Sequence, residues 1–153
     1  MRIVVGYESQ DRSGHALAAA HDLATRLGAG LVVVHVRDAV VSTAPSSAVG
    51  LPLEPGGAVL STPLTPEHLA EVRHDVEAEV AAAGVTGAEV RVEQGWPPDA
   101  LQTVADEVDA YLLVVGGQAH GFAAFLEHLV TGSVAHELER RARRPLLVVP
   151  APS

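Results

Sequence analysis

The sequence predicts a doubly wound α/β domain, with a five-stranded parallel sheet in the order 3-2-1-4-5 and helices on both faces. Short apolar runs alternate along the chain with longer segments in which apolar residues recur at helical spacing. Most of the runs are continuously apolar, as expected for strands that are covered on both faces. The chain has 153 residues, of which 48% are hydrophobic, so we expect one domain over 1–153 with a sizeable core.

The first expected elements are a strand, a helix and a second strand. Residues 2–6 form a short β-branched run, which indicates a buried strand. Helical spacing of Leu and Ala then continues to Leu27, and the glycines at 28 and 30 end this helix. Residues 31–36 are the second continuous apolar run. Residues 38–64 are rich in Pro, Gly and Ser, so we expect a long loop, as a surface insertion or as a lid.

The rest of the chain continues the alternation of helix and strand. Thr65 and Pro66 are typical of an N-cap and a first helical position, and the apolar stripe that follows ends at Gly84. Val90 and Val92 alternate with polar residues, which is typical of an edge strand. The remaining elements are strands at 89–93, 111–115 and 145–149 and helices at 97–108 and 133–143.

Two glycine turns predict an anion site. The turn at Gly116–Gly121 follows the fourth strand, and Gly132-Ser133 opens the last helix. A helix start offers free N–H groups and the positive end of the helix dipole, and glycine allows a ligand to approach the backbone. Ligands of doubly wound sheets bind at the carboxyl ends of the strands, where the winding reverses. If that reversal lies between strands one and four, these turns form a phosphate pocket there, facing the loop at Gly6–Gln10.

Composition excludes several classes of protein. The formal net charge is −9, which argues against a nucleic-acid partner. The chain contains no Lys, so it is not a phosphate-loop NTPase of the G-x-x-x-x-G-K-[ST] type. It contains no Cys, and no run approaches the ~18 apolar residues of a membrane span. We therefore expect a soluble, cytoplasmic protein without a membrane partner.

The histidines do not predict a metal site, because none of the eight forms an H-E-x-x-H arrangement. His120 is notable for its place in the glycine turn, whereas His35 is expected to be a buried, hydrogen-bonded core residue. No nucleophile elbow, catalytic carboxylate pair or Ser-His-Asp set is evident, so we name no catalytic residue. We therefore expect no robust catalysis.

Four parts of the chain are similar to the motifs of one known family. Ile3–Ser9 is like an opening strand followed by a Gly-x-Asp-Gly-Ser turn, and Val34-His35-Val36 is like the end of a second strand. Two parts are more specific: Leu112–Gly117, a fourth strand with its glycine, and the closing pair Gly132-Ser133-Val134 and Arg144–Val149. In these parts the chain resembles the universal stress protein family, and the resemblance covers nearly its whole length.

The resemblance implies a stress-response or signalling module that binds ATP, and we expect at most weak ATP hydrolysis. Family members with an ATP site hold the adenine with a carboxylate after strand one and the backbone at the end of strand two, here Glu8 and Val36. Their glycine loops hold the ribose and phosphates, with Mg²⁺ as the expected counter-ion here because Lys is absent. The implied binding residues are Gly6, Tyr7, Glu8, Val36, Gly116, Gly117, Gln118, Ala119, Gly121, Gly132, Ser133 and Val134.

The sequence departs from the family's Gly-x2-Gly-x9-Gly-[Ser/Thr] pattern. Glu8 stands where Asp is usual, and Ser9 replaces a Gly. Ala119 stands at the second Gly of one alignment, which leaves 12 residues before Gly132. An alternative is therefore a nucleotide-free dimer of the same fold that acts through protein partners. An enzyme of the wider adenine-nucleotide α-hydrolase-like group, such as an ATP pyrophosphatase, would need an S-G-G-x-D-S loop, which is absent.

The fifth strand predicts a homodimer. Leu146–Val149 is uncharged and apolar, yet the predicted order places it at a sheet edge. Such an edge favours pairing with a second copy, and the family resemblance also implies a dimer here. The alternative is a strand covered by its own helices and tail.

Overall fold

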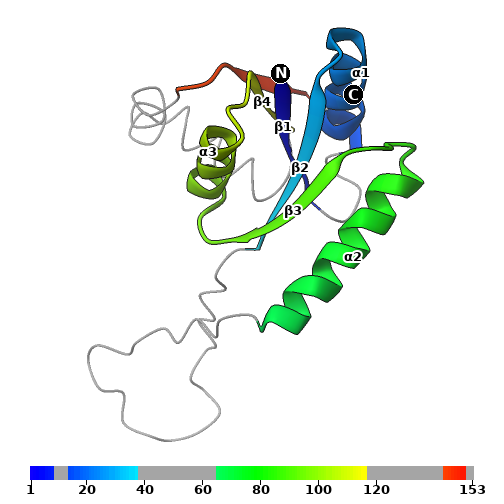
Figure 1. Ribbon diagram of the computed structural model, residues 1–153, viewed down its shortest axis with the longest axis vertical. Helices are drawn as coiled ribbons and strands as arrows, with labels where there is room; N and C mark the ends of the chain where they lie inside the picture. The colour runs from blue at the N-terminus through cyan, green and yellow to red at the C-terminus, as the bar shows by residue number, and fades with distance from the viewer. Residues whose placement is uncertain (9–13, 38–64, 117–142, 151–153) are drawn as a thin grey trace, which may run out of the picture.

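The fold is a five-stranded parallel sheet in the order β3-β2-β1-β4-β5, which confirms the predicted topology (Figure 1). A computed structural model of the chain describes residues 1–8, 14–37, 65–116 and 143–150. The elements are β1 (Arg2–Gly6), α1 (Gly14–Leu27), β2 (Gly30–Arg37), α2 (Pro66–Ala82), β3 (Glu89–Gln94), α3 (Pro97–Glu107), β4 (Leu112–Gly116) and β5 (Leu146–Val149). The expected loop over 38–64 and the expected helix over 133–143 lie outside these described residues.

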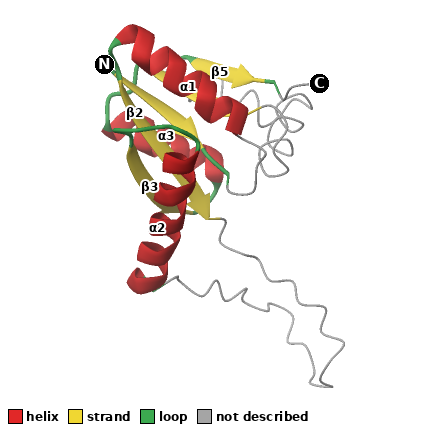
Figure 2. Ribbon diagram, turned by 90° about the vertical axis from the view of Figure 1, so that its right-hand side faces the viewer, coloured by secondary structure: helices red, strands yellow, loops and turns green. Residues whose placement is uncertain are grey.

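Helices cover both faces of the sheet. Helices α1 and α2 lie on one face, and α3 lies on the other (Figure 2). Alternation along each strand divides the core accordingly: Val5 and Val33 pack with the α1 and α2 side, whereas Val4 and Val32 pack with α3. Two-sided burial is the reason why the strands read as continuous apolar runs in the sequence.

The helix boundaries follow from local chemistry. The hydroxyl of Thr65 accepts a hydrogen bond from the backbone N–H of His68 at 3.3 Å, which confirms Thr65 as the N-cap of α2. Helix α1 ends at Leu27, and the φ of the next residue, Gly28, is 61°, in the left-handed region that glycine favours. The N–H of Ala29 then donates to the carbonyl of Ala24 at 2.8 Å, closing the helix end. Within the described ranges, no helix is long and apolar enough to cross a membrane.

Strand β5 is an exposed apolar edge. It pairs only with β4 in the described sheet, and Leu146, Leu147 and Val148 are 44%, 38% and 39% exposed. The preceding Arg144 fastens the start of this strand to the turn between α3 and β4. Its guanidinium donates to the carboxylate of Asp109 at 2.6 Å and to the carbonyl of Ala110 at 2.9 Å.

Candidate functional site

The carboxyl ends of β1, β2 and β4 meet at one edge of the sheet. Strand β1 pairs with β2 on one side and with β4 on the other, in parallel register with both. The winding reverses between β1 and β4, which makes this edge the topological switch point. Neighbouring strands lie about 4.8 Å apart, so groups at the ends of β1 and β4 can reach one small ligand.

Part of the predicted binding set lies at this edge. Gly6 ends β1 and Gly116 ends β4, and both are buried; Val36 lies near the end of β2. Tyr7 and Glu8 follow β1 directly. The other predicted positions lie outside the described residues; they are Gly117, Gln118, Ala119, Gly121, Gly132, Ser133 and Val134.

Tyr7 links β1 to the neighbouring strand and to a helix. Its N–H donates to the carbonyl of Val34 at 2.8 Å, which extends the β1–β2 pairing one step beyond Gly6. The residue is 8% exposed and packs in the α1 and α2 core, and its hydroxyl donates to Oε2 of Glu79 in α2 at 2.8 Å. The backbone just before Glu8 is therefore held from two directions.

His35 is a buried, hydrogen-bonded residue, as the sequence predicts. It is 7% exposed, and its Nδ1 lies 3.0 Å from the carbonyl oxygen of Tyr7. A carbonyl only accepts, so Nδ1 carries the hydrogen and donates it. This bond satisfies the polar ring of a residue that follows the buried Val32, Val33 and Val34 in β2.

Glu8 supplies a carboxylate at the switch point. The residue is half-buried, and its Oε2 oxygen is buried. An ionised carboxylate only accepts hydrogen bonds, so it selects ligand groups that carry N–H or O–H. Val36 is half-buried near the end of β2, and its side chain packs on the α3 side.

A separate hollow lies beside the edge strand β3, between this strand and α2. It is open to solvent and has a volume of about 480 Å³, and the described residues that line it are Pro66, Leu69, Ala70, Arg73, Arg91, Val92 and Glu93. Of the predicted binding residues that the structure describes, none lines it, and β2 separates β3 from β1. The hollow is therefore distinct from the switch point.

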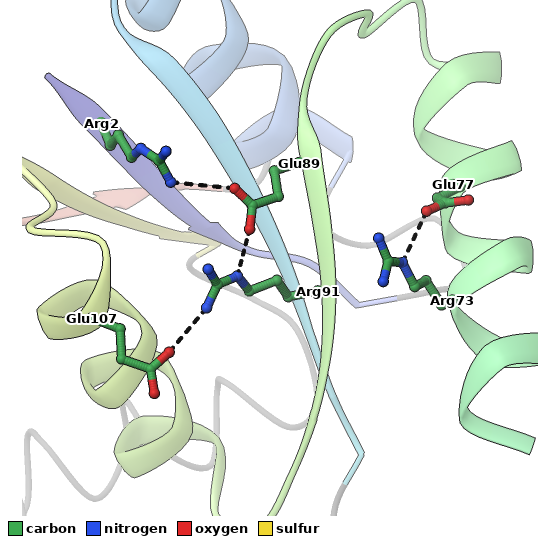
Figure 3. A network of polar contacts seen from close by, with 6 residues as sticks. All are labelled: Arg2, Arg73, Glu77, Glu89, Arg91 and Glu107. Carbon is green, nitrogen blue, oxygen red and sulfur yellow. Dashed lines mark hydrogen bonds and ion pairs between the residues drawn. The ribbon is translucent and has the colours of Figure 1, made fainter. Parts of the chain in front are cut away.

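Ion pairs connect the start of β1 to β3 and to the end of α3. Glu89, at the start of β3, bonds to Arg2 at 3.3 Å and to Arg91 at 2.7 Å, and Arg91 continues to Glu107 at 2.9 Å (Figure 3). The hydrogen bond from Arg91 lowers the pKa of Glu89, although partial burial opposes the shift. Arg73 and Glu77 form a separate pair along α2 (Figure 3). Glu89 and Arg91 pair in register with Val32 and Val34 of β2, so the network runs from the start of β1 along the edge strand β3.

Sequence reasoning did not find the bond between Tyr7 and Glu79. These residues are 72 positions apart, and the pattern assigned Tyr7 to the site through the family turn alone. One signal was available: a Tyr two residues after a buried valine continues the inward face of the strand, and a buried phenol normally has a hydrogen-bond partner. The identity of the partner depends on how α2 lies on the sheet.

Comparison with known proteins places the chain in a family. The sequence profile of the Universal stress protein family matches residues 1–150. The Universal stress protein YxiE of Bacillus subtilis is 30% identical over 161 aligned positions, covering 97% of each chain. The chain therefore belongs to the universal stress protein family.

Two solved structures with nucleotides resemble this chain. A universal stress protein in complex with cAMP is 27% identical, with a TM-score of 0.57, and the match covers 97% of this chain and 96% of that one. The universal stress protein from Archaeoglobus fulgidus in complex with dAMP is 25% identical, with a TM-score of 0.55, and the match covers 97% of both chains. The ligands of both relatives are adenine nucleotides.

Proposed function

We propose that this chain binds an adenine nucleotide, with ATP as the leading candidate, at the switch point between β1 and β4, and that it acts as a binding module in stress response or signalling. The observation that carries the proposal is the convergence of Glu8, Val36 and Gly116 at the carboxyl edge of the sheet. Relatives that bind cAMP and dAMP support the adenine class of ligand.

Each part of the nucleotide has a proposed partner. The carboxylate of Glu8 accepts from the amino group of adenine or from a ribose hydroxyl, and the backbone near Val36 contacts the base. The turn that begins at Gly116 and the Gly132-Ser133 helix start hold the phosphates through backbone N–H groups. Mg²⁺ bound through the phosphates offsets their charge, because the chain carries no Lys and a net charge of −9.

The direct test is whether nucleotide is present and rebinds. Freshly purified protein is denatured, and any released nucleotide is identified by chromatography. The emptied protein is then titrated in a calorimeter with ATP, ADP and AMP in the presence of Mg²⁺. Saturable heat with any of them supports the proposal; no heat at millimolar nucleotide together with no released nucleotide favours the nucleotide-free module that acts through protein partners.

Two variants assign the phosphate contacts. Gly132→Val should abolish binding, because a side chain there blocks the close approach of the phosphates to the backbone. Ser133→Ala should weaken binding by about 1–3 kcal/mol through one lost hydrogen bond to a charged group. Equal affinity of both variants and the unaltered protein would place the phosphates elsewhere.

We also propose that the chain works in the cytoplasm as a homodimer that pairs through β5. Three exposed apolar side chains on this edge strand support the proposal. Sedimentation at micromolar concentration should give about twice the 15.8 kDa chain mass. Val148→Asp should shift the protein to monomer, while Val148→Thr, of similar shape, should remain dimeric. A profile that is monomeric for the unaltered chain would contradict the dimer.

A further inference from the structure

The backbone that leads into Glu8 is held by a side chain of the neighbouring strand. His35 in β2 donates from Nδ1 to the carbonyl of Tyr7 at 3.0 Å. The N–H of Tyr7 is bonded in turn to Val34 of the same strand, at 2.8 Å. Both backbone polar groups of Tyr7 are thus fixed by β2.

The bond from His35 also fixes the start of Glu8. The carbonyl of Tyr7 and the N–H of Glu8 belong to one peptide group, which is planar. The described chain contains no cis peptide bond, so these two groups point in opposite directions. With the carbonyl directed at His35, the N–H of Glu8 is directed away from β2. The orientation of this plane then determines where the Cα of Glu8 lies and from which position its side chain starts.

The side chain of Tyr7 is also held in place. The residue is 8% exposed, and its hydroxyl donates to Glu79 of α2 at 2.8 Å. A rotation of the peptide plane would have to break the contact with His35 while the ring stayed anchored. His35 is equally confined, because it is 7% exposed.

We propose that His35 is a positioning residue of the nucleotide site: its Nδ1–H bond to the Tyr7 carbonyl orients the Tyr7–Glu8 peptide and so directs the Glu8 carboxylate at the ligand. The inference rests on the proposed function, and it adds a residue that does not touch the ligand. A preorganised carboxylate loses less conformational entropy when the ligand binds and forms a better aligned hydrogen bond.

The test is a double-mutant cycle between His35 and Glu8, read as the dissociation constant for AMP by calorimetry. His35→Leu removes the donor and keeps an apolar side chain in the core, and it should weaken binding about tenfold, or about 1.4 kcal/mol. Glu8→Ala should weaken binding at least as much. In the Glu8→Ala background, His35→Leu should have almost no further effect, because there is no carboxylate left to direct.

The matched control is His35→Asn, whose side-chain N–H can occupy the place of Nδ1. It should restore most of the affinity that His35→Leu loses. A purely structural role would instead give additive losses in the cycle, or would leave the affinity of all His35 variants unchanged, and either result overturns the inference. If the unaltered protein binds AMP but Glu8→Ala binds it equally well, the inference is wrong while nucleotide binding stands. If the unaltered protein binds no adenine nucleotide, both proposals fail.

One measurement needs no variant. Two-dimensional ¹H–¹⁵N spectra of labelled protein distinguish the protonated ring nitrogen of each histidine. His35 should carry its hydrogen on Nδ1, whether or not AMP is present. A bare Nδ1 cannot donate to a carbonyl and would overturn the inference even if His35→Leu did not fold.

Discussion

Helix α2 is attached to the sheet by few buried side chains, and this predicts a local weakness. Val76 and Val80 are the buried residues of the helix, and most of its other residues are exposed. Val76→Ala removes two methyl groups from a side chain that is 1% exposed. Each buried carbon contributes about 0.8 kcal/mol, and the cavity adds to the cost. Because the outer side of α2 is open to solvent, the helix can partly close that cavity.

We therefore expect Val76→Ala to lower the free energy of unfolding by about 1.5–2.5 kcal/mol. Urea denaturation followed by circular dichroism measures this loss, at one fixed protein concentration because pairing of copies would add to the apparent stability. The exposed His74→Ala, on the same helix, is the control and should change stability by less than about 0.5 kcal/mol.

Hydrogen exchange locates the effect. The amides of α2 should lose more protection than those of α3, which buries Leu101, Val104 and Ala105 on the other face. A loss of stability equal to that of His74→Ala would refute the assigned role of Val76. Equal loss of protection in α2 and α3 would show that α2 opens only when the whole domain unfolds, contrary to this reasoning.

Two further predictions concern the charged contacts. Arg144→Met should lower the urea midpoint of unfolding, because methionine keeps the apolar stem but cannot form the bonds to Asp109 and to the carbonyl of Ala110. An unchanged midpoint would show that these bonds do not stabilise the position of β5. The pKa of Glu89 is lowered from 4.5, so its contribution to stability is present above that pH and is lost as the pH falls through the lowered value. Glu89→Gln should therefore be less stable than the unaltered protein at pH 7, and this difference in stability should shrink in acid. Denaturation at a series of pH values measures the difference. A difference that does not shrink would show that the ion pair with Arg91 does not contribute.

Local patterns were sufficient to predict the sheet, because the strands are buried on both faces. The runs at 2–6 and 31–36 correspond to β1 and β2, with small shifts at the ends of the latter. The fourth strand lies one residue later than its apolar run. Tyr111 is 55% exposed and precedes the strand, whereas Gly116 still pairs with Val149 in β5. Hydropathy reports burial, and it does not report where a ladder of backbone hydrogen bonds ends.

The sequence predicts that a buried polar side chain is hydrogen-bonded, but it does not identify the partner. A histidine within a buried run must be hydrogen-bonded, and this was sufficient to predict the state of His35. Its partner, the carbonyl of Tyr7, depends on the parallel register of β1 and β2. The bond between Arg2 and Glu89 joins residues 87 positions apart, for which no local spacing exists. The proposed binding role of Glu8 came from the family resemblance, and it remains a prediction.

The two edges of the sheet differ in chemistry, and this limits how copies of the chain can assemble. Strand β5 presents exposed leucine and valine, whereas β3, at the opposite edge, carries Glu89, Arg91 and Glu93. Charged side chains on an edge strand oppose the addition of another strand. Pairing through β5, as proposed, uses the apolar edge of both copies and leaves two charged edges outside. Growth would then stop at two subunits, so the same apolar strand that favours association would not lead to open-ended fibres.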